Sequence, residues 1–378
     1  MRYFLFFLLL NLLGCHSNKL DKAEHFTVGT KSFIWKDLSR TDPHYGGFRL
    51  VNVRVWYPGD INVNDTLYEP TPYYYEIDKV YKKLMNWSDD DFNFVSNITT
   101  KSLSGYPISK QHKKLPVLLL SPSLGGNLSM YTYYAEHLAQ NGFVVIGVNH
   151  LYESEYVIDV DNQIYSSNHK FHDSLKSLNI PKQITADDYR KLKEARHKVL
   201  GEDLVFCLNK LEEINVVEFN GLLDLQRVGA LGHSIGGAAS ICASLLDKRL
   251  KAIANIDGTP PYTALQNGID VPFIFIEDLI DYKNNSGHNI IHIRRSNFCK
   301  LNRKESYRVL LANTNHNSFL DINYYLAETD NEKKEALNTL NNTAYYLSMF
   351  FNIYLNGKNL ELNATVSDSL EVYTDFNY

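Results

Sequence analysis

Residues 228–240, with the sequence VGALGHSIGGAAS, constrain the fold of this chain more than any other stretch. An apolar run predicts a buried strand, the pattern G-x-S-x-G follows at 232–236, and small residues at helical spacing come next. Between such a strand and helix, a serine takes a strained backbone angle that exposes its hydroxyl, and side chains at the two flanking glycines would collide with neighbouring backbone. We therefore predict that Ser234 is a nucleophile. The alternative is a glycine-rich turn with a buried, unreactive serine.

The rest of the chain alternates predicted strands and helices, which is typical of a mostly parallel sheet with helices on both faces. Continuous apolar runs predict buried parallel strands, whereas FRLVNVRVWYP alternates apolar and polar residues, as an antiparallel strand at a sheet edge does. Besides the strand and helix around Ser234, the predicted strands are 48–58, 117–121, 143–150, 251–257, 271–278 and 307–314, and the predicted helices are 75–87, 129–140, 185–211, 319–327 and 332–355. We expect one α/β domain over residues 27–357.

The first 15 residues, MRYFLFFLLLNLLGC, resemble the leader of a bacterial lipoprotein. Arg2 precedes an apolar run that is too short to span a bilayer, and this run ends in Leu-Leu-Gly-Cys. Cleavage before Cys15 and lipidation of its thiol would tether the mature chain to a membrane. We expect residues 1–14 to be a signal peptide, 15–26 to be a polar tether, and the protein to lie in a bacterial cell envelope. Plain secretion is the alternative.

Two other segments lack a clear pattern. Residues 151–184 are polar and irregular, and we expect them to form an insertion that acts as a lid or specificity loop. Residues 358–378 are predicted to be a polar, loosely attached tail.

Composition narrows the function classes. The chain has 378 residues, 44% of them hydrophobic, so it can bury a large core. A net charge of -5, without a dense block of Lys and Arg, argues against nucleic acid as a partner. Cys207, Cys242 and Cys299 show no metal-ligand spacing, and the first two are expected on apolar helix faces. We expect a monomer that needs no metal or cofactor.

A serine nucleophile needs a base and an acid, and the candidates follow the order found in α/β-hydrolases, where both come after the nucleophile at strand ends. His316 follows the predicted strand YRVLLANT, so we predict that it is the base. Asp257 ends the predicted strand that comes after the helix following Ser234, whereas Glu277 and Asp278 end the next strand. We favour Asp257, because Asp-Gly at an abrupt strand end turns the carboxylate toward the top of the sheet, and Glu277 and Asp278 are the alternatives.

Attack by Ser234 on a carbonyl group creates an oxyanion that needs two backbone N–H donors. Ile235 is the first candidate, because it follows the nucleophile and begins the helix. Leu124 is the second, because it lies in the loop SPSLGG after the buried strand 117–121. An ordinary glycine-rich loop between a strand and a helix is the alternative reading of that segment.

These segments together resemble the platelet-activating-factor acetylhydrolase family and its bacterial relatives, often labelled predicted dienelactone hydrolases. The similarity runs from about residue 48 to residue 355 and rests on VWYP, SLGG, GFVVIGVNHLYES, GHSIGGA, AIANIDG, NHNSFLD and MFFNIYLNG. The resemblance implies an α/β-hydrolase fold and calcium-independent hydrolysis of short-chain or oxidised acyl esters through an acyl-serine intermediate. The site residues it implies are Ser234, Asp257 and His316, with Leu124 and Ile235 as oxyanion donors.

One segment departs from the family pattern. The family has Ser-His-Gly-Leu-Gly where residues 121–125 of this chain are Ser-Pro-Ser-Leu-Gly, and this changes the backbone angles allowed beside Leu124. The leading hypothesis is a membrane-tethered serine esterase that acts on a small-molecule or lipid ester. The alternatives are an acetyl or feruloyl esterase acting on carbohydrates, and a non-catalytic lipoprotein that uses the same scaffold for binding.

Overall fold

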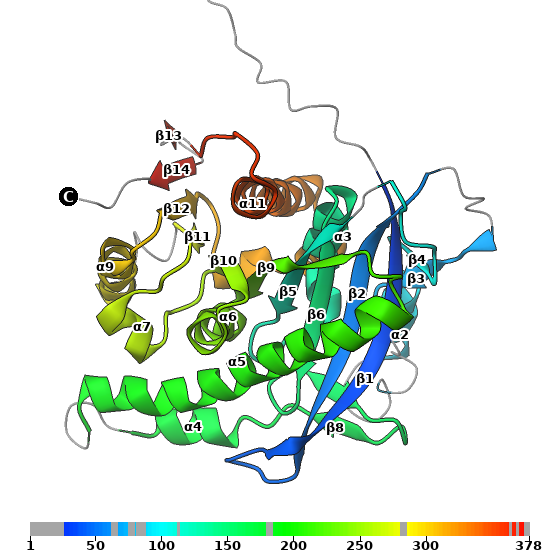
Figure 1. Ribbon diagram of the computed structural model, residues 1–378. Helices are drawn as coiled ribbons and strands as arrows, with labels where there is room; N and C mark the ends of the chain where they lie inside the picture. Colours follow the sequence, from blue (N-terminus) through cyan, green and yellow to red (C-terminus); the bar gives the residue numbers. More distant parts are fainter. Residues whose placement is uncertain are drawn as a thin grey trace, which may run out of the picture.

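A twelve-stranded sheet forms the centre of the protein (Figure 1). The computed structural model describes residues 26–61, 67–74, 80, 88–111, 114–178, 184–279, 286–362, 365–367 and 370–373. Cys15, the predicted signal peptide and nearly all of the predicted helix 75–87 lie outside these residues. The strands are ordered β13-β14-β12-β11-β10-β9-β5-β6-β2-β1-β4-β3 across the sheet.

The middle of the sheet is parallel, as the apolar runs predict. Its strands are β12 (Ser306–Leu311), β11 (Phe273–Asp278), β10 (Leu250–Ile256), β9 (Leu223–His233), β5 (Leu115–Ser121) and β6 (Val144–His150). Every residue of β5 and β6 is buried. Because parallel strands share one carboxyl edge, the loops that follow β5, β9, β10 and β12 are brought together there.

The prediction that residues 48–58 form an edge strand is wrong. This strand, β2 (Phe48–Gly59), pairs antiparallel with β6 on one side and with β1 (Thr27–Thr41) on the other. β4 (Thr99–Ser104) and β3 (Pro70–Pro72) extend the sheet beyond β1. β1 escapes sequence analysis because many of its side chains are polar and partly exposed, so it lacks an apolar period.

Two segments expected to be irregular have regular structure. Residues 151–184 contain the hairpin of β7 (Tyr156–Ile158) and β8 (Ile164–Ser166), followed by α4 (Lys170–Lys176). The predicted loose tail instead adds β14 (Leu370–Tyr373) and β13 (Thr365–Ser367) to the sheet, with β14 antiparallel to β12. Elements of three to seven residues are too short to show a period, and the short strands form by pairing, β7 with β8 and β14 with β12.

Helices cover both faces of the sheet (Figure 1). One face carries α5 (Ala186–Val217), α6 (Ile235–Leu246), α7 (Tyr262–Asn267) and α9 (Ser286–Leu301). The other carries α3 (Thr132–Gln140), which a 3-10 turn at Leu128–Tyr131 precedes, and α11 (Asp330–Asn356). Two further short helices are α2 (Asp89–Ser96) and α10 (Ile322–Leu326).

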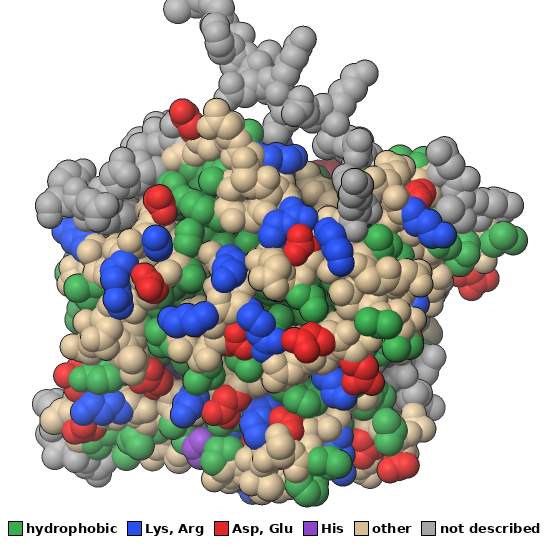
Figure 2. All heavy atoms as spheres, in the orientation of Figure 1, with side chains coloured by type: hydrophobic (Ala, Val, Ile, Leu, Met, Phe, Trp, Pro, Cys, Tyr) green, Lys and Arg blue, Asp and Glu red, His purple; other side chains and the backbone are tan. Residues whose placement is uncertain are grey.

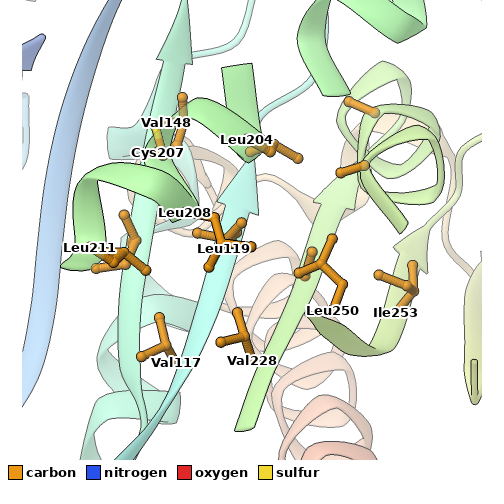
Figure 3. Packing of buried hydrophobic residues seen from close by; sticks show 14 of the residues in the cluster. Val117, Leu119, Val148, Leu204, Cys207, Leu208, Leu211, Val228, Leu250 and Ile253 are labelled. Carbon is orange, nitrogen blue, oxygen red and sulfur yellow. The ribbon is translucent and has the colours of Figure 1, made fainter. Parts of the chain in front are cut away.

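Alternation along β5 divides the core between these two layers. Val117 and Leu119 belong to the cluster that includes α5, and Figure 3 shows Leu208 of that helix beside Leu119. Leu118 and Leu120 point to the opposite face and pack in the cluster formed with α3 and α11. Successive side chains of a strand point to opposite faces, so a fully apolar strand is what a sheet covered on both sides requires.

The surface is mixed in charge. Over the face shown in Figure 2, Lys and Arg side chains are interspersed with Asp and Glu. Among the described residues, no helix combines the length and the apolar character needed to cross a bilayer. Within the same residues, no group of three or more metal-ligating side chains is found.

Candidate active site

Ser234 occupies a sharp turn between β9 and α6. Its backbone angles are φ 57° and ψ -118°, a strained combination for a residue with a side chain. A Cβ at Gly232 would lie 2.3 Å from the backbone of Gly236, and one at Gly236 would lie 2.2 Å from the carbonyl oxygen of Ser121. The two glycines are therefore required by close backbone approach, as predicted.

The structure brings Ser234, His316 and Asp257 together, and we call these three residues the elbow triad. His316 Nε2 lies 2.9 Å from Ser234 Oγ, and His316 Nδ1 lies 2.5 Å from Asp257 Oδ2. The three residues follow β9, β12 and β10, so the shared carboxyl edge of the parallel strands explains how distant parts of the chain meet. The side chain of His316 is 43% exposed, which leaves the triad open to a substrate.

The acid of the triad is held ionised by its surroundings. Asp257 is 6% exposed, and Arg295 donates to it over 2.8 Å. Burial alone would raise the pKa of this carboxyl group, but the charge of Arg295 and the hydrogen bond with His316 outweigh burial and lower the pKa to about 2. Glu277, an alternative acid in the sequence analysis, instead accepts hydrogen bonds from Arg308 and Arg295.

His233 is a part of the site that the sequence analysis missed. Its ring lies 4.7 Å from the ring of His316, and the hydroxyl of Tyr131 lies 2.9 Å from its Nδ1. Burial, and then the neighbouring His316, lower the pKa of His233 to about 3, so it stays neutral and adds no charge beside the triad. Its place inside the G-x-S-x-G pattern was the available signal, because that position lies directly before the nucleophile.

The two predicted oxyanion donors lie in the cavity that contains Ser234. Ile235 is the first residue of α6, where a backbone N–H has no partner within the helix. The loop that carries Leu124 is fixed to the segment after β6, because Gly125 N donates to Glu153 O over 2.7 Å and Glu155 N donates to Gly126 O over 3.0 Å. A rigid loop beside Leu124 is what a preorganised oxyanion site requires.

Ser123, which stands where the resembled family has glycine, takes part in this loop. Its backbone N–H donates to the Tyr131 hydroxyl over 3.0 Å, and that hydroxyl donates to Ser123 Oγ over 2.9 Å. Tyr131 therefore links the loop to His233. The departure from the family pattern is accommodated by a tyrosine that contacts both sides of the site.

The cavity around Ser234 has a volume of about 330 Å³. Besides the elbow triad, its walls come from α4, α5, α6 and α9 and from the end of β11. His172 and Leu175 of α4 show that the segment 151–184 contributes to the cavity wall. That this segment moves as a lid stays a prediction.

Comparison with known proteins assigns the chain to a family. Residues 25–334 match the model of the family described as platelet-activating factor acetylhydrolase, isoform II. The chain belongs to this family. The resemblance seen in the sequence is thereby confirmed.

Two relatives are similar to this chain in sequence, both at low identity. A platelet-activating factor acetylhydrolase from Canis lupus familiaris is 20% identical over 294 residues, which cover 72% of this chain and 63% of that protein. A probable 1-alkyl-2-acetylglycerophosphocholine esterase from Arthroderma benhamiae is 27% identical over 146 residues, which cover 38% of this chain and 31% of that protein. The chain therefore spans less than two thirds of the length of either relative.

Among solved structures, a ferulic acid esterase from Streptomyces cinnamoneus superposes with a TM-score of 0.71 at 22% sequence identity. The match covers 93% of this chain and 97% of that structure. At this identity the likeness shows the fold, and it confirms the predicted α/β-hydrolase architecture of this family member.

Proposed function

We propose that this protein is a serine ester hydrolase whose catalytic residues are those of the elbow triad. The observation that carries the proposal is the chain of hydrogen bonds from Ser234 through His316 to a carboxylate with a pKa of about 2, at a strained turn in an open cavity. Such a chain allows a serine to act as a nucleophile, because the imidazole takes its proton and the carboxylate stabilises the imidazolium.

In the proposed reaction, Ser234 Oγ attacks the ester carbonyl carbon while His316 Nε2 takes its proton. The backbone N–H groups of Leu124 and Ile235 stabilise the oxyanion of the tetrahedral intermediate. As the ester C–O bond breaks, His316 returns the proton to the leaving alcohol and an acyl-serine remains. Water, activated by the same imidazole, then releases the acid and restores Ser234.

We further propose short-chain or oxidised acyl esters of the lipid type as substrates, hydrolysed without calcium. Two facts support this choice. The family and one relative are named as acetylhydrolases of platelet-activating factor and the other relative as a probable 1-alkyl-2-acetylglycerophosphocholine esterase, and the cavity is small, at about 330 Å³. The proposed steps use protein groups and water, so turnover should be the same with calcium and with a chelator.

Feruloyl or acetyl esters of carbohydrates are the second candidate. The structural neighbour from Streptomyces cinnamoneus, a ferulic acid esterase, favours this alternative. An aromatic residue, Tyr189, lines the cavity and could pack against a feruloyl ring. Methyl ferulate tested beside an acetyl ester of an ether phospholipid would separate the two candidates.

The proposed lipid anchor on Cys15 stays a prediction, together with the envelope localisation. It requires that the full-length protein partition with membranes and that Cys15→Ala abolish lipid attachment. Mass spectrometry of the N-terminal peptide tests this, and an unmodified peptide from a membrane fraction would rule the anchor out.

The experiment for the main proposal measures hydrolysis of 4-nitrophenyl esters from two to twelve acyl carbons, with calcium and with EDTA, by wild type and Ser234→Ala. We expect turnover that falls with chain length, is indifferent to calcium and disappears in the variant. Turnover that persists in Ser234→Ala would contradict the proposal. Absence of turnover on every ester would favour a non-catalytic binding protein instead.

A further inference from the structure

The cavity that contains Ser234 has a second polar wall, which the proposed mechanism does not use. It is formed by His172 from α4 and by Lys193 and His197 from α5. Lys193 and His197 are four residues apart on one helix, so their side chains lie on the same face. We call His172, Lys193 and His197 the basic cluster.

The two histidines of the basic cluster are buried, and Lys193 is half-buried. His197 is 3% exposed, and neither of its ring nitrogens has a hydrogen-bond partner in the described part of the chain. His172 is 7% exposed, and its Nε2 likewise has no hydrogen-bond partner among the described residues. Buried polar atoms in proteins are nearly always hydrogen-bonded, so these nitrogens require an explanation.

The nearest carboxylate is already occupied. Glu153 Oε1 lies 3.9 Å from His172 Nε2, beyond hydrogen-bond distance. Both oxygens of that carboxylate accept hydrogen bonds from Arg196, and Arg196 is fully buried beside it. No carboxylate of the described ranges forms an ion pair with Lys193. Among the described residues, Glu153 is therefore the one carboxylate within ion-pair distance of the basic cluster, and it is already paired with Arg196.

The acidic residues that line the cavity come from the ends of β10 and β11, and not from α4 or α5. Asp257 and Glu277 both accept hydrogen bonds from Arg295, and Asp278 lies next to them at the end of β11. The charges of Asp257 and Glu277 are thus compensated locally. The carboxylates of Asp257 and Glu277 thus have arginine partners, whereas no carboxylate of the described residues pairs with Lys193.

The pKa shifts agree with this geometry. Burial, and then the charges of Lys193 and His172, hold the pKa of His197 well below its usual range. Burial also lowers the pKa of Lys193. An anion bound among these groups would raise both pKa values, because an opposite charge favours the protonated form of a base.

We propose that the basic cluster is an anion-binding subsite, which holds a carboxylate or phosphate group carried by the ester substrate. This inference rests on the proposed esterase function, because it assigns a second group of the same substrate molecule to the same cavity. Lys193 supplies the charge, and the two imidazoles supply N–H donors. Hydrogen bonds between charged groups of this kind are stronger than neutral ones and fix orientation as well as affinity.

The test compares two esters of equal acyl length. The half-ester 4-nitrophenyl hydrogen glutarate ends in a carboxylate, and 4-nitrophenyl valerate is its neutral counterpart. We expect the ratio of their kcat/KM values, anionic over neutral, to fall about tenfold or more in Lys193→Met, since one charge-assisted hydrogen bond corresponds to a change of that size. An unchanged ratio would overturn the subsite.

A matched control comes from the same helix. Lys198, whose side chain is 59% exposed and pairs with Glu202, loses the same charge in Lys198→Met without altering the basic cluster. The ratio should stay within about twofold in this variant, because an exposed charge is screened by salt. A fall equal to that of Lys193→Met would mean that net charge, and not the subsite, sets the preference.

The source of the anion is settled by competition. Free glutarate and glycerol 3-phosphate are tested as inhibitors of valerate hydrolysis, the first standing for an acyl carboxylate and the second for a phosphorylated alcohol. Inhibition by either one that weakens in Lys193→Met supports the subsite and names the group. Inhibition by neither contradicts it.

Failure of the subsite can be told apart from failure of the esterase proposal. Calorimetric titration of Ser234→Ala with glutarate and with inorganic phosphate measures anion binding without turnover. We expect Ser234→Ala to bind these anions, and we expect the added substitution His172→Gln to weaken the binding. This second variant tests the subsite even if Lys193→Met does not fold. Valerate hydrolysis by the wild type without anion binding by Ser234→Ala would support the esterase proposal and contradict the subsite. Anion binding without hydrolysis of any ester by the wild type would support the subsite and contradict the esterase proposal.

Discussion

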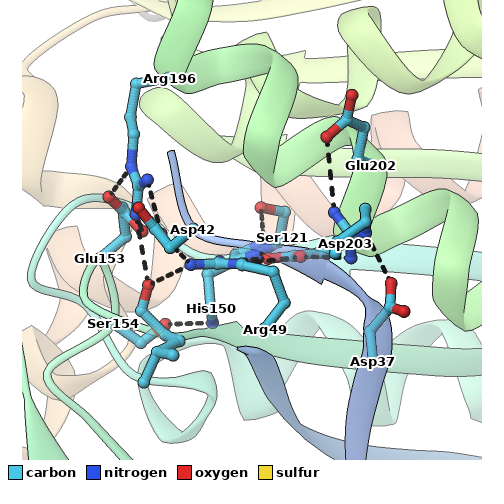
Figure 4. Close-up of polar contacts among 12 residues, drawn as sticks. Asp37, Asp42, Arg49, Ser121, His150, Glu153, Ser154, Arg196, Glu202 and Asp203 are labelled. Atoms are coloured by element: carbon cyan, nitrogen blue, oxygen red, sulfur yellow. Dashed lines mark hydrogen bonds and ion pairs between the residues drawn. The ribbon is translucent and has the colours of Figure 1, made fainter. Parts of the chain in front are cut away.

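The elbow triad has a buried counterpart in the same protein, and the two differ mainly in their access to solvent. Ser121 Oγ lies 2.9 Å from His150 Nε2, and His150 Nδ1 lies 2.9 Å from Asp203 Oδ2 (Figure 4). The order of groups and the serine-to-histidine distance are those of the elbow triad. We call Ser121, His150 and Asp203 the buried triad.

Burial separates the two triads. The side chain of the elbow histidine, His316, is 43% exposed, whereas His150 is 1% exposed. Ser121 is fully buried at the end of β5, where it is paired with Gly232 of the parallel strand β9. A substrate carbonyl therefore has a path to Ser234 but not to Ser121.

The carboxylates also have different surroundings. Asp203 accepts hydrogen bonds from Arg49 and Arg40 as well as contacting the imidazole, within a network of buried ions that Figure 4 shows. Arg49 joins this network to Asp42, which in turn contacts Arg196. The buried triad is thus one part of a larger cluster of buried ions that connects β2, β6 and α5. We call this network the ion cluster, and its other members are Arg40, Asp42, Arg49 and Arg196.

The comparison shows that a Ser-His-Asp chain of hydrogen bonds does not by itself distinguish the two serines, whereas access and backbone conformation do. Ser234 combines this chain with a positive φ and lines a cavity, whereas Ser121 has partners of the same kinds but lies in a fully buried strand. We therefore expect changes in the elbow triad to alter activity and changes in the buried triad to alter stability.

The largest expected effect is on catalysis. Ser234→Ala should lower kcat for a short-chain ester by about 10⁴-fold or more, because the nucleophile of a triad acts as a unit with its base. Stability should change little, since the side chain is small and partly exposed. Steady-state rates and a thermal unfolding curve on the same preparation check both statements, and substantial residual turnover would remove Ser234 from its role.

The next effect is on stability. Asp203→Asn should lower the free energy of unfolding by about 3–5 kcal/mol, because it removes a buried carboxylate that pairs with the fully buried Arg49 and with His150, and Asp42 alone remains to offset the charge of Arg49. Glu213→Gln, which removes an exposed carboxylate from the same helix, should cost less than about 1 kcal/mol. Urea denaturation measures both. Equal losses in the two variants would show that the ion cluster is not a structural centre.

A third prediction concerns acid. The pKa of Asp257 is about 2 in the folded protein, below its unfolded value, so the unfolded state takes up the proton first as the pH falls. The stability that this group supplies is complete above about pH 4 and is lost as the pH falls toward 2. Between pH 5 and pH 3, Asp257→Asn should lose about 1 kcal/mol less than wild type. Urea titrations at the two pH values test this, and parallel losses would contradict it.

The smallest effect sharpens the comparison most. Ser121→Ala removes one buried hydrogen bond to His150, so it should cost about 1 kcal/mol of unfolding free energy. Ester turnover should remain within a few-fold of wild type, in contrast to Ser234→Ala. A variant of Ser121 that is stable but inactive would mean that the buried triad contributes to catalysis.

The sequence predicts the elbow triad because each member follows a strand of a recognisable kind. Asp257 and His316 lie 23 and 82 positions beyond Ser234, yet parallel strands with a shared carboxyl edge bring such positions together. The predicted parallel strands were confirmed for the same reason, since buried strands are continuous apolar runs.

The rest of the site could not be predicted in this way. Arg295, which lowers the pKa of Asp257, lies within a helix and belongs to no motif. The three members of the buried triad come from the ends of two strands and from a helix, and their spacing along the sequence follows no known motif. His172 stands in a segment without a period, so its approach to α5 depends on tertiary packing alone.

The most direct test of the account is to identify which serine reacts with a fluorophosphonate. The folded protein is treated with the probe, digested and analysed by mass spectrometry, with heat-denatured protein as the control. We predict a single adduct on Ser234 that denaturation abolishes, and no adduct on Ser121. No adduct on Ser234, or an adduct on Ser121 of the folded protein, would contradict the central claim that access and backbone strain make one triad reactive and leave the other structural.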